Sequence, residues 1–212
     1  MKIALIGYGK MGKAVEELSR AAGHTCSNTL VSDADVCIDF SVGGAVKKTA
    51  LSIGIPWVLG TTGWNKDEIL PIVEERGIPL LYAPNFSIGM ALFRKMAKLG
   101  RSLFEGYEME GLEIHHTEKK DAPSGTALKL MEEIEGLNFT SIRKRKEVGT
   151  HQIMFRDQEE SVELIHRAHD RKVFARGAIL AAEWLEGKKG IYTFDDYIEE
   201  RVTCHLQELQ QH

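Results

Sequence analysis

The chain has 212 residues, of which 43% are hydrophobic and 27% are charged, and its formal net charge is −4 at pH 7. This length is enough for one large domain or two small domains with their own cores. The acidic balance argues against a general nucleic-acid-binding protein, and three widely spaced cysteines indicate neither a disulfide framework nor a zinc site. No apolar run approaches a membrane-spanning length, and residues 1–6 are typical of a strand rather than of a signal peptide. We therefore expect a cytoplasmic protein without a nucleic-acid or membrane partner.

A glycine-rich turn near the start of the chain is the first feature that predicts a ligand. Residues 3–6 form a short apolar run, as expected for a buried parallel strand, and an amphipathic helix that ends at Gly23 follows the turn. The order strand, G-x-G-x-x-G, helix is the one that a dinucleotide-binding fold requires, and a glycine turn without a ligand is the alternative. The predicted cofactor-binding residues of the turn are Gly7, Tyr8, Gly9, Lys10, Met11 and Gly12.

Three further apolar segments, 36–40, 55–59 and 79–82, are predicted to be strands of the same parallel sheet. Helices expected over 45–53 and 66–76 separate them. Each strand ends in small or polar residues, and α/β sheets bind ligands at the carboxyl ends of their strands. Ordinary turn chemistry is the alternative at each of these strand ends. We expect the nicotinamide ring to lie against Gly60, Thr61, Thr62, Ala83, Pro84, Asn85 and Phe86.

The residues after the expected second strand leave the choice of nicotinamide cofactor open. Ser27 or Asn28 stands where an acidic residue would normally bind the adenosine ribose. Lys10 and Lys13 are close enough to the glycine turn to reach a 2′-phosphate, but exposed lysines near a helix start are more often only solvated. The sequence therefore predicts NADH or NADPH without choosing between them.

The second half of the chain alternates amphipathic helices with short strands. Helices are expected over 88–104, 127–134 and 173–185, and strands over 108–115, 152–155 and 161–165. Thr193 with Asp196 predicts a capping box for a last helix. The predicted fold class is α/β with two domains. Residues 1–87 and about 173–212 form a Rossmann-type dinucleotide-binding domain, and residues 88–172 form a smaller α+β domain for substrate binding and oligomerisation.

The segment 113–127 combines groups that bind anions with groups that donate protons. Two adjacent histidines and two adjacent lysines precede Ser124, which is a favourable N-cap residue. Gly125 and Thr126 would fall in the first helical turn, whose free N–H groups and positive dipole end attract an anion. The segment predicts a site for a carboxylated substrate with a proton donor beside it. A solvated, charged loop between a strand and a helix is the alternative.

This segment carries a family resemblance. Its pattern, Glu113-Ile114-His115-His116 … Lys119 … Asp121-Ala122-Pro123-Ser124-Gly125-Thr126-Ala127, resembles the motif of dihydrodipicolinate reductases, now called 4-hydroxy-tetrahydrodipicolinate reductases. Further blocks of similarity follow in family order at 7–12, 38–41, 60–63, 83–89, 149–151 and 166–178. The resemblance implies an NAD(P)H-dependent reduction in the diaminopimelate route to lysine. It also implies a homotetramer held together through the sheet of the substrate domain.

The resemblance also implies roles for single residues. His115 falls on the acid/base of the family and Lys119 on the lysine that follows it, while His116, Gly125 and Thr126 fall on groups that bind a substrate carboxylate. The substrate that the resemblance implies is a six-membered ring with two carboxylates, which loses water and gains a hydride. Hydride delivery to a conjugated imine leaves an enamine-like species that needs a proton, and imidazole or ammonium groups can supply it.

Other polar features receive smaller roles. For the charged run 143–146 we favour plain solvation over a part in an active site. His151 is expected to be structural or to contact the edge of the substrate. His166 and His169 would face opposite sides of a strand-like segment, so no metal is predicted. The remaining alternatives for function are another two-domain NAD(P)-dependent dehydrogenase and an NAD(P)-sensing regulatory module.

Overall fold

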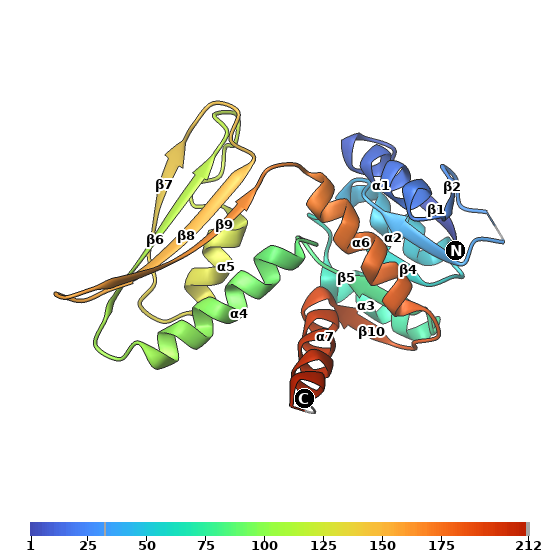
Figure 1. Cartoon of the computed structure of the whole chain (residues 1–212). Coiled ribbons are helices and arrows are strands. Elements are labelled where there is room, and N and C mark those ends of the chain that lie inside the picture. The colour runs from blue at the N-terminus through green and yellow to red at the C-terminus, as the bar shows by residue number, and fades with distance from the viewer. Residues whose placement is uncertain (32, 211–212) are drawn as a thin grey trace. The chain divides into compact units, whose positions relative to one another are not determined.

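The computed structural model describes residues 1–31 and 33–210. The chain forms two compact units (Figure 1), of which unit 1 contains Met1–Ile88 and Lys172–His212 and unit 2 contains Gly89–Arg171. Each unit has its own sheet and its own hydrophobic core. Among the described helices, none is long and apolar enough to cross a membrane.

Unit 1 is built on a six-stranded sheet in the order β10-β5-β4-β3-β1-β2, and every neighbouring pair is parallel. Its strands are β1 (Lys2–Ile6), β2 (Thr25–Ser27), β3 (Val36–Asp39), β4 (Trp57–Leu59), β5 (Leu80–Tyr82) and β10 (Ile191–Thr193). All three residues of β4 are fully buried, as expected for a strand with helices on both faces of its sheet. The predicted α/β class with a Rossmann-type sheet is confirmed.

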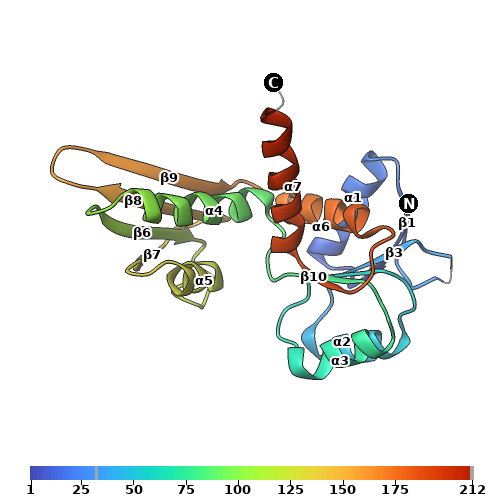
Figure 2. The same ribbon diagram turned by 90° about the horizontal axis from the view of Figure 1, so that it is seen from below.

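Helices cover both faces of this sheet (Figure 2). α1 (Lys10–Ala21) and α6 (Lys172–Leu185) lie on one face, and α2 (Gly43–Ser52) and α3 (Lys66–Glu75) lie on the other. The last helix, α7 (Phe194–Leu209), follows β10 directly. The hydroxyl of Thr193 accepts a hydrogen bond from the Asp196 N–H, and the Asp196 carboxylate accepts one from the Thr193 N–H, which confirms the predicted capping box.

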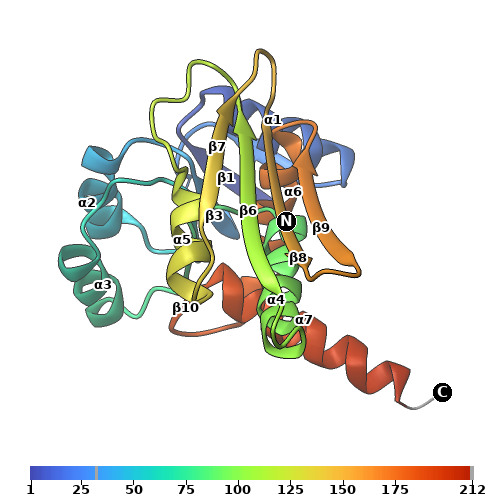
Figure 3. The same cartoon turned by 90° about the vertical axis from the view of Figure 1, so that its left-hand side faces the viewer.

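Unit 2 is a four-stranded sheet with two helices on one face (Figure 3). The strand order is β7-β6-β8-β9, in which only β6 and β7 are parallel. The elements are α4 (Ile88–Leu103), β6 (Glu108–His115), α5 (Gly125–Glu133), β7 (Phe139–Arg143), β8 (Gly149–Arg156) and β9 (Ser161–Ala168). Alternate residues of the strands point toward the helices, where Phe93, Leu130, Ile153 and Phe155 form the centre of the core.

Two strands escaped prediction from the sequence. β7 carries only two apolar residues with polar residues between and after them, so its signal is weak, and β10 has only three residues. The residues that face the unit 2 helices from β7 are Phe139, Ser141 and Arg143, which mixes one apolar side chain with two polar ones. These polar positions belong to the functional site.

Candidate functional site

The glycine turn after β1 is held in shape by close backbone contacts. Gly7 has φ +84°, and a Cβ there would lie 2.4 Å from the carbonyl of Phe40. A Cβ on Gly12 would lie 2.2 Å from the carbonyl oxygen of Gly7. At Gly9, by contrast, an added Cβ would meet no described atom within 4 Å. The fold itself therefore requires glycine at two of the three positions and leaves the third open to a ligand.

The amino end of α1 can receive an anion. Gly9 is the N-cap residue and gives no side-chain hydrogen bond, and the first turn holds no acidic residue. The free N–H groups and the helix dipole are therefore available to a pyrophosphate. Tyr8 is exposed beside this turn and donates a hydrogen bond to Glu16, while the Lys13 ammonium lies 5.9 Å from the centre of the Tyr8 ring.

The ends of β3 and β4 are tied together by a buried carboxylate. Asp39 Oδ1 accepts hydrogen bonds from the Thr61 hydroxyl, at 3.0 Å, and from the Ser41 N–H, at 2.8 Å. A Cβ on Gly60 would lie 2.1 Å from the Phe40 ring, so this strand end also needs glycine. Of the residues predicted at these ends, Thr61 is thus committed to the fold, and Thr62 is exposed.

The loop after β5 holds the other predicted cofactor residues. Asn85 Oδ1 accepts a hydrogen bond from the Ser87 N–H at 2.8 Å, whereas Ala83 is buried and Pro84 is exposed. The Phe86 ring is 1% exposed and packs against the rings of two other phenylalanines. Phe86 is therefore a core residue, and only its backbone is left to face a cofactor.

In unit 2 a row of polar side chains crosses the inner face of the sheet. Glu113 on β6 stands opposite Ser141 on β7 and opposite His151 on β8, and His151 stands opposite His166 on β9. His115 lies two residues beyond Glu113 on the same face and opposite Arg143. The strand register therefore gathers polar residues that are far apart in the sequence.

Glu113 is the centre of this group. Its side chain is fully buried, and its Oε1 accepts hydrogen bonds from the Ser124 N–H at 2.9 Å and from the Ser141 hydroxyl at 2.7 Å. Arg143 Nη1 lies 3.7 Å from the same oxygen. Burial acts to raise the pKa of Glu113, but the hydrogen bonds from the two serines outweigh it and hold the pKa below its ordinary value. Glu113 is therefore a buried carboxylate anion.

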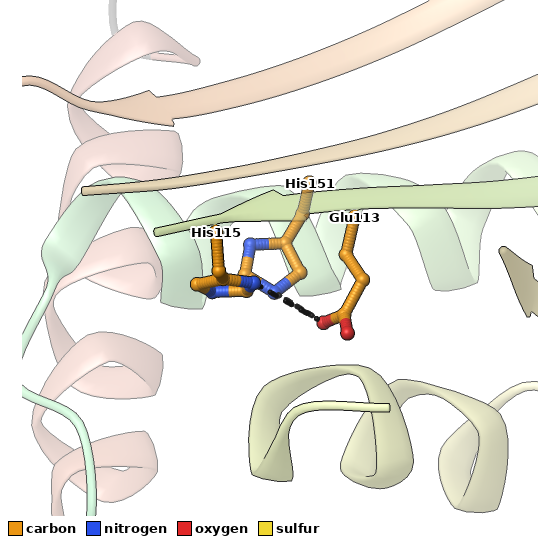
Figure 4. Close-up of side chains that lie close together, drawn as sticks. All are labelled: Glu113, His115 and His151. Atoms are coloured by element: carbon orange, nitrogen blue, oxygen red, sulfur yellow. Dashed lines mark ion pairs between the residues drawn. The ribbon is translucent and has the colours of Figure 1, made fainter. Parts of the chain in front are cut away.

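Two imidazoles face the other oxygen of this carboxylate (Figure 4). His115 Nδ1 lies 3.6 Å and His151 Nε2 lies 3.7 Å from Glu113 Oε2, and the two rings meet edge to face with their centres 5.1 Å apart. Both histidines are buried. Burial lowers the pKa of His115 against the pull of Glu113, and it lowers the pKa of His151 to about 3. Both imidazoles are consequently neutral near pH 7.

Arg143 corrects an expectation from the sequence. The sequence predicts solvation for the whole run 143–146. This prediction holds for Lys144, Arg145 and Lys146, which are exposed, but it is wrong for Arg143. Its Nε donates to the carbonyl oxygen of Lys119 at 3.2 Å, and its Nη2 donates to the carbonyl oxygen of residue 121. Alternate residues of β7 point inward, and Arg143 is one of them. Its hydrogen bonds to the two carbonyl groups hold the loop that carries Lys119 in place.

That loop leads into the predicted helix start. The Ser124 hydroxyl accepts a hydrogen bond from the Ala127 N–H at 3.2 Å, so the predicted N-cap is confirmed and Gly125 opens α5. Lys119 Nζ lies 2.8 Å from the Asp121 carboxylate. The hydrogen bond from Lys119 lowers the pKa of Asp121, and the backbone N–H of Gly125 adds to this effect. A carboxylate of the chain itself thus occupies an anion position between the lysine and the helix start.

The two remaining predicted residues lie at the edges of this arrangement. His116 follows the last residue of β6 and is partly buried, and its Nδ1 has no hydrogen-bond partner among the described residues. Thr126 is the second residue of α5 and is partly exposed. Both therefore remain predictions for substrate binding. Sequence reasoning gave no role to Glu113 or Ser141, although an acidic residue on the inner face of a strand, two before a histidine, was a usable signal.

Two family profiles match the chain. The profile described as "Dihydrodipicolinate reductase, N-terminus" matches residues 24–86, and the profile described as "Dihydrodipicolinate reductase, C-terminus" matches residues 89–198. The 4-hydroxy-tetrahydrodipicolinate reductase of Christiangramia forsetii is 34% identical over 94% of this chain and 98% of that protein. The chain belongs to the dihydrodipicolinate reductase family. It is therefore an oxidoreductase, and its role is that of the reductase in lysine biosynthesis.

A second curated relative supports the same family, and two solved structures share the fold. The 4-hydroxy-tetrahydrodipicolinate reductase of Staphylococcus carnosus is 34% identical over 92% of this chain and 99% of its own length. The structure titled "Dipicolinate bound Dihydrodipicolinate reductase from Paenisporosarcina sp. TG-14" aligns with a TM-score of 0.75 at 22% identity, over 91% of this reductase and 97% of that chain. The diaminopimelate dehydrogenase of Corynebacterium glutamicum shares the fold at a TM-score of 0.53 and 13% identity. Membership of this reductase family implies a nicotinamide cofactor.

Proposed function

We propose that this reductase converts 4-hydroxy-tetrahydrodipicolinate to tetrahydrodipicolinate with loss of water, and that segment 113–126 holds the substrate. The single observation that supports this most strongly is the group of His115, Lys119 and Glu113 around the amino end of α5. This arrangement places neutral imidazole, ammonium and helix amides within one small region. A ring with two carboxylates and a carbon that must exchange protons needs all three.

The substrate carboxylate would take the place that Asp121 occupies. Lys119 already binds one carboxylate there, and the Asp121 side chain is half exposed, so it can move aside. Thr126, in the first turn of α5, and His116, after the end of β6, would complete the contacts to the dianion. Substrate binding would therefore exchange an internal carboxylate for an external one and leave the net charge around Lys119 unchanged.

The proton steps would be divided between His115 and Lys119. Neutral His115 would remove the proton on the carbon next to the imine, while Lys119 would protonate the leaving hydroxyl, and water would depart to give the conjugated imine. After the hydride adds, the imidazolium of His115 would return its proton to the enamine carbon. Glu113 stabilises that imidazolium, since its carboxylate faces Nδ1. Lys119 regains its proton from solvent.

The cofactor would lie on unit 1. The uncapped amino end of α1 fits a pyrophosphate, and the open space at Gly9 allows close approach of the backbone. When bound, the reduced nicotinamide supplies the hydride. Between NADH and NADPH, the lack of an acidic residue at 27–28 and the exposed Lys10 allow either cofactor. We place the enzyme in the cytoplasm, where both cofactors are available.

A direct assay tests this function. Oxidation of NADH and of NADPH is followed in parallel, while dihydrodipicolinate synthase generates the substrate in place. We expect synthase-dependent oxidation of at least one cofactor. Absence of turnover with both would overturn the proposal, and the ratio of the two kcat/KM values gives the cofactor preference.

The glycine turn gives a prediction that separates cofactor binding from folding. Gly9→Ala should leave the melting temperature of the free enzyme unchanged, because the new Cβ meets no described atom within 4 Å. It should raise the KM for the cofactor by about tenfold or more, because the methyl group would stand where the pyrophosphate approaches. Gly12→Ala is the contrast: its Cβ would lie 2.2 Å from a backbone oxygen and should destabilise the fold by about 1–3 kcal/mol. A Gly9→Ala enzyme with unchanged cofactor KM would contradict this binding mode.

We also propose that the reductase is a homotetramer that assembles through the outer face of the unit 2 sheet. Within unit 2 the described helices lie on the inner face only, and the outer face carries an apolar group of Leu112, Ile114, Ile142, Met154 and Ile165. Ile165→Asp should dissociate the assembly without unfolding it, because this side chain is 52% exposed. Light scattering gives the mass, and Leu51→Asp, at a similarly exposed leucine of α2, is the matched control. An unchanged mass for Ile165→Asp would contradict this interface.

A further inference from the structure

The Glu113, His115 and His151 side chains form an arrangement that suits a metal ion as well as proton transfer. One ligand atom from each of the three residues lies within 4.8 Å of the other two, and all three residues are buried. Figure 4 shows the side chains projecting from neighbouring strands toward the Glu113 carboxylate. The distances from Glu113 Oε2 to the two imidazole nitrogens, 3.6 and 3.7 Å, are too long for hydrogen bonds.

These distances match those between ligands that share one ion. Zn²⁺ binds histidine nitrogen and carboxylate oxygen at about 2.0–2.2 Å, so two ligands at a tetrahedral angle lie roughly 3.4 Å apart. These two distances exceed this by only a few tenths of an ångström. The third side, between the two imidazoles, lies within 4.8 Å and would shorten when both rings turn toward a shared ion. Two histidines and one glutamate are also a donor set that zinc enzymes use, with water as the fourth ligand.

The surroundings of Glu113 orient the carboxylate for this role. The Ser124 N–H and the Ser141 hydroxyl both bind Oε1, which leaves Oε2 directed at the two histidines. Neither Oε2 nor His115 Nδ1 has a hydrogen-bond partner among the described residues. Hydrogen bonds that orient a metal ligand in this way typically raise the affinity for the metal by roughly 10–100-fold.

Two features weaken the site. Arg143 Nη1 lies 3.7 Å from Glu113 Oε1, and its charge opposes a second cation nearby. His151 Nε2 would also exchange its contact with the Ser124 hydroxyl, at 3.3 Å, for the ion. The site should therefore bind the ion reversibly rather than hold it permanently.

We propose that Glu113, His115 and His151 bind a divalent transition-metal ion of the zinc class, and that this ion inhibits the reductase. The inhibition rests on the proposed function, because the ion would occupy the His115 nitrogen that faces Glu113 and would remove the charge that supports proton transfer. The binding itself does not depend on that function. It goes beyond the sequence analysis, which predicted no metal because His166 and His169 would face opposite sides of a strand-like segment.

Cobalt absorbance tests the binding. Metal-free enzyme is titrated with Co²⁺, and the visible absorption band of a low-symmetry, nitrogen-containing site is recorded. We expect one Co²⁺ per chain, displaced by Zn²⁺, with an affinity at least 10-fold lower in Glu113→Gln and in His151→Asn. His205→Ala is the matched control, since His205 and Glu208 form an exposed pair 3.4 Å apart that could bind Co²⁺ adventitiously. A band that survives in both site variants, or disappears in His205→Ala, would overturn the site.

Melting temperatures show which variants are folded, and His115→Gln provides a third test of the site if either other variant fails to fold. The activity assay then separates the two claims. Loss of turnover with Zn²⁺, restored by a chelator and shifted to at least 10-fold higher Zn²⁺ in His151→Asn, supports inhibition. Binding of Co²⁺ and Zn²⁺ without loss of turnover overturns the inhibition. An enzyme that binds the ion but has no turnover even with chelator overturns the proposed function and the inhibition with it, and leaves the site standing.

Discussion

Lys119→Ala should lower kcat/KM by roughly 10²–10⁴-fold, the usual contribution of a positioned proton donor. Lys119 is partly exposed, binds the Asp121 carboxylate at 2.8 Å and is held in place by Arg143 through its own carbonyl group. Loss of the ammonium removes both the proton for the leaving hydroxyl and a contact to the substrate carboxylate, so kcat and KM should both worsen. Steady-state kinetics with the better cofactor measure the effect.

Lys120→Ala is the matched control for this prediction. Lys120 is the next residue along the chain and is exposed, with no contact to Glu113 or Asp121 among the described interactions. We expect kcat/KM to change less than twofold, since a solvated surface lysine contributes little. Equal losses in Lys119→Ala and Lys120→Ala would show that general positive charge, and not a positioned donor, explains the effect.

Glu113→Gln should lower kcat/KM by roughly 10–10²-fold, which is less than the 10²–10⁴-fold typical of a direct acid or base, because Glu113 acts through His115. The amide can keep the shape of the carboxylate and accept from Ser124 and Ser141, but the negative charge that favours the imidazolium of His115 is lost. The substitution should also cost about 1.5–3 kcal/mol of stability, the worth of hydrogen bonds to a charged group. Chelator is present throughout, so that metal binding does not contribute.

The pH profile of kcat/KM should shift in a definite direction in Glu113→Gln. His115 acts as a base only when it is neutral, so kcat/KM rises with pH through its pKa. Burial already lowers that pKa, and Glu113 opposes the shift; without the carboxylate the pKa falls further. The rising limb of the profile in Glu113→Gln should therefore move to lower pH, while the plateau falls. A rising limb that stays in place or moves to higher pH would contradict the role of Glu113.

The sequence was sufficient for the parts of the fold that have strong local signals. Apolar runs predict β1, which leads into the glycine turn, and the exact span of β6. Capping chemistry predicts the N-cap at Ser124. These signals are local, because each depends on neighbouring residues along the chain. The segment 113–127 could likewise be found as a site from its composition alone.

The chemistry around Glu113 could not be predicted in the same way. Ser141, His151 and Arg143 reach the site through strand pairing, and the register of β7, which gave a weak strand signal, decides that Arg143 points inward. Register depends on the whole sheet and not on any one segment. Phe86, predicted as a wall for the nicotinamide, has its ring in the core of unit 1, because it packs against Phe40 and Phe194, which are distant in the sequence.

A crystal structure of the enzyme with oxidised cofactor and pyridine-2,6-dicarboxylate tests the central claim most directly. We predict that one carboxylate binds the Gly125 and Thr126 N–H groups in place of Asp121, with Lys119 in contact. The ring should lie about 3–3.5 Å from the nicotinamide carbon that carries the hydride. A dicarboxylate bound away from the amino end of α5, with Asp121 still paired to Lys119, would contradict the assignment of the substrate site.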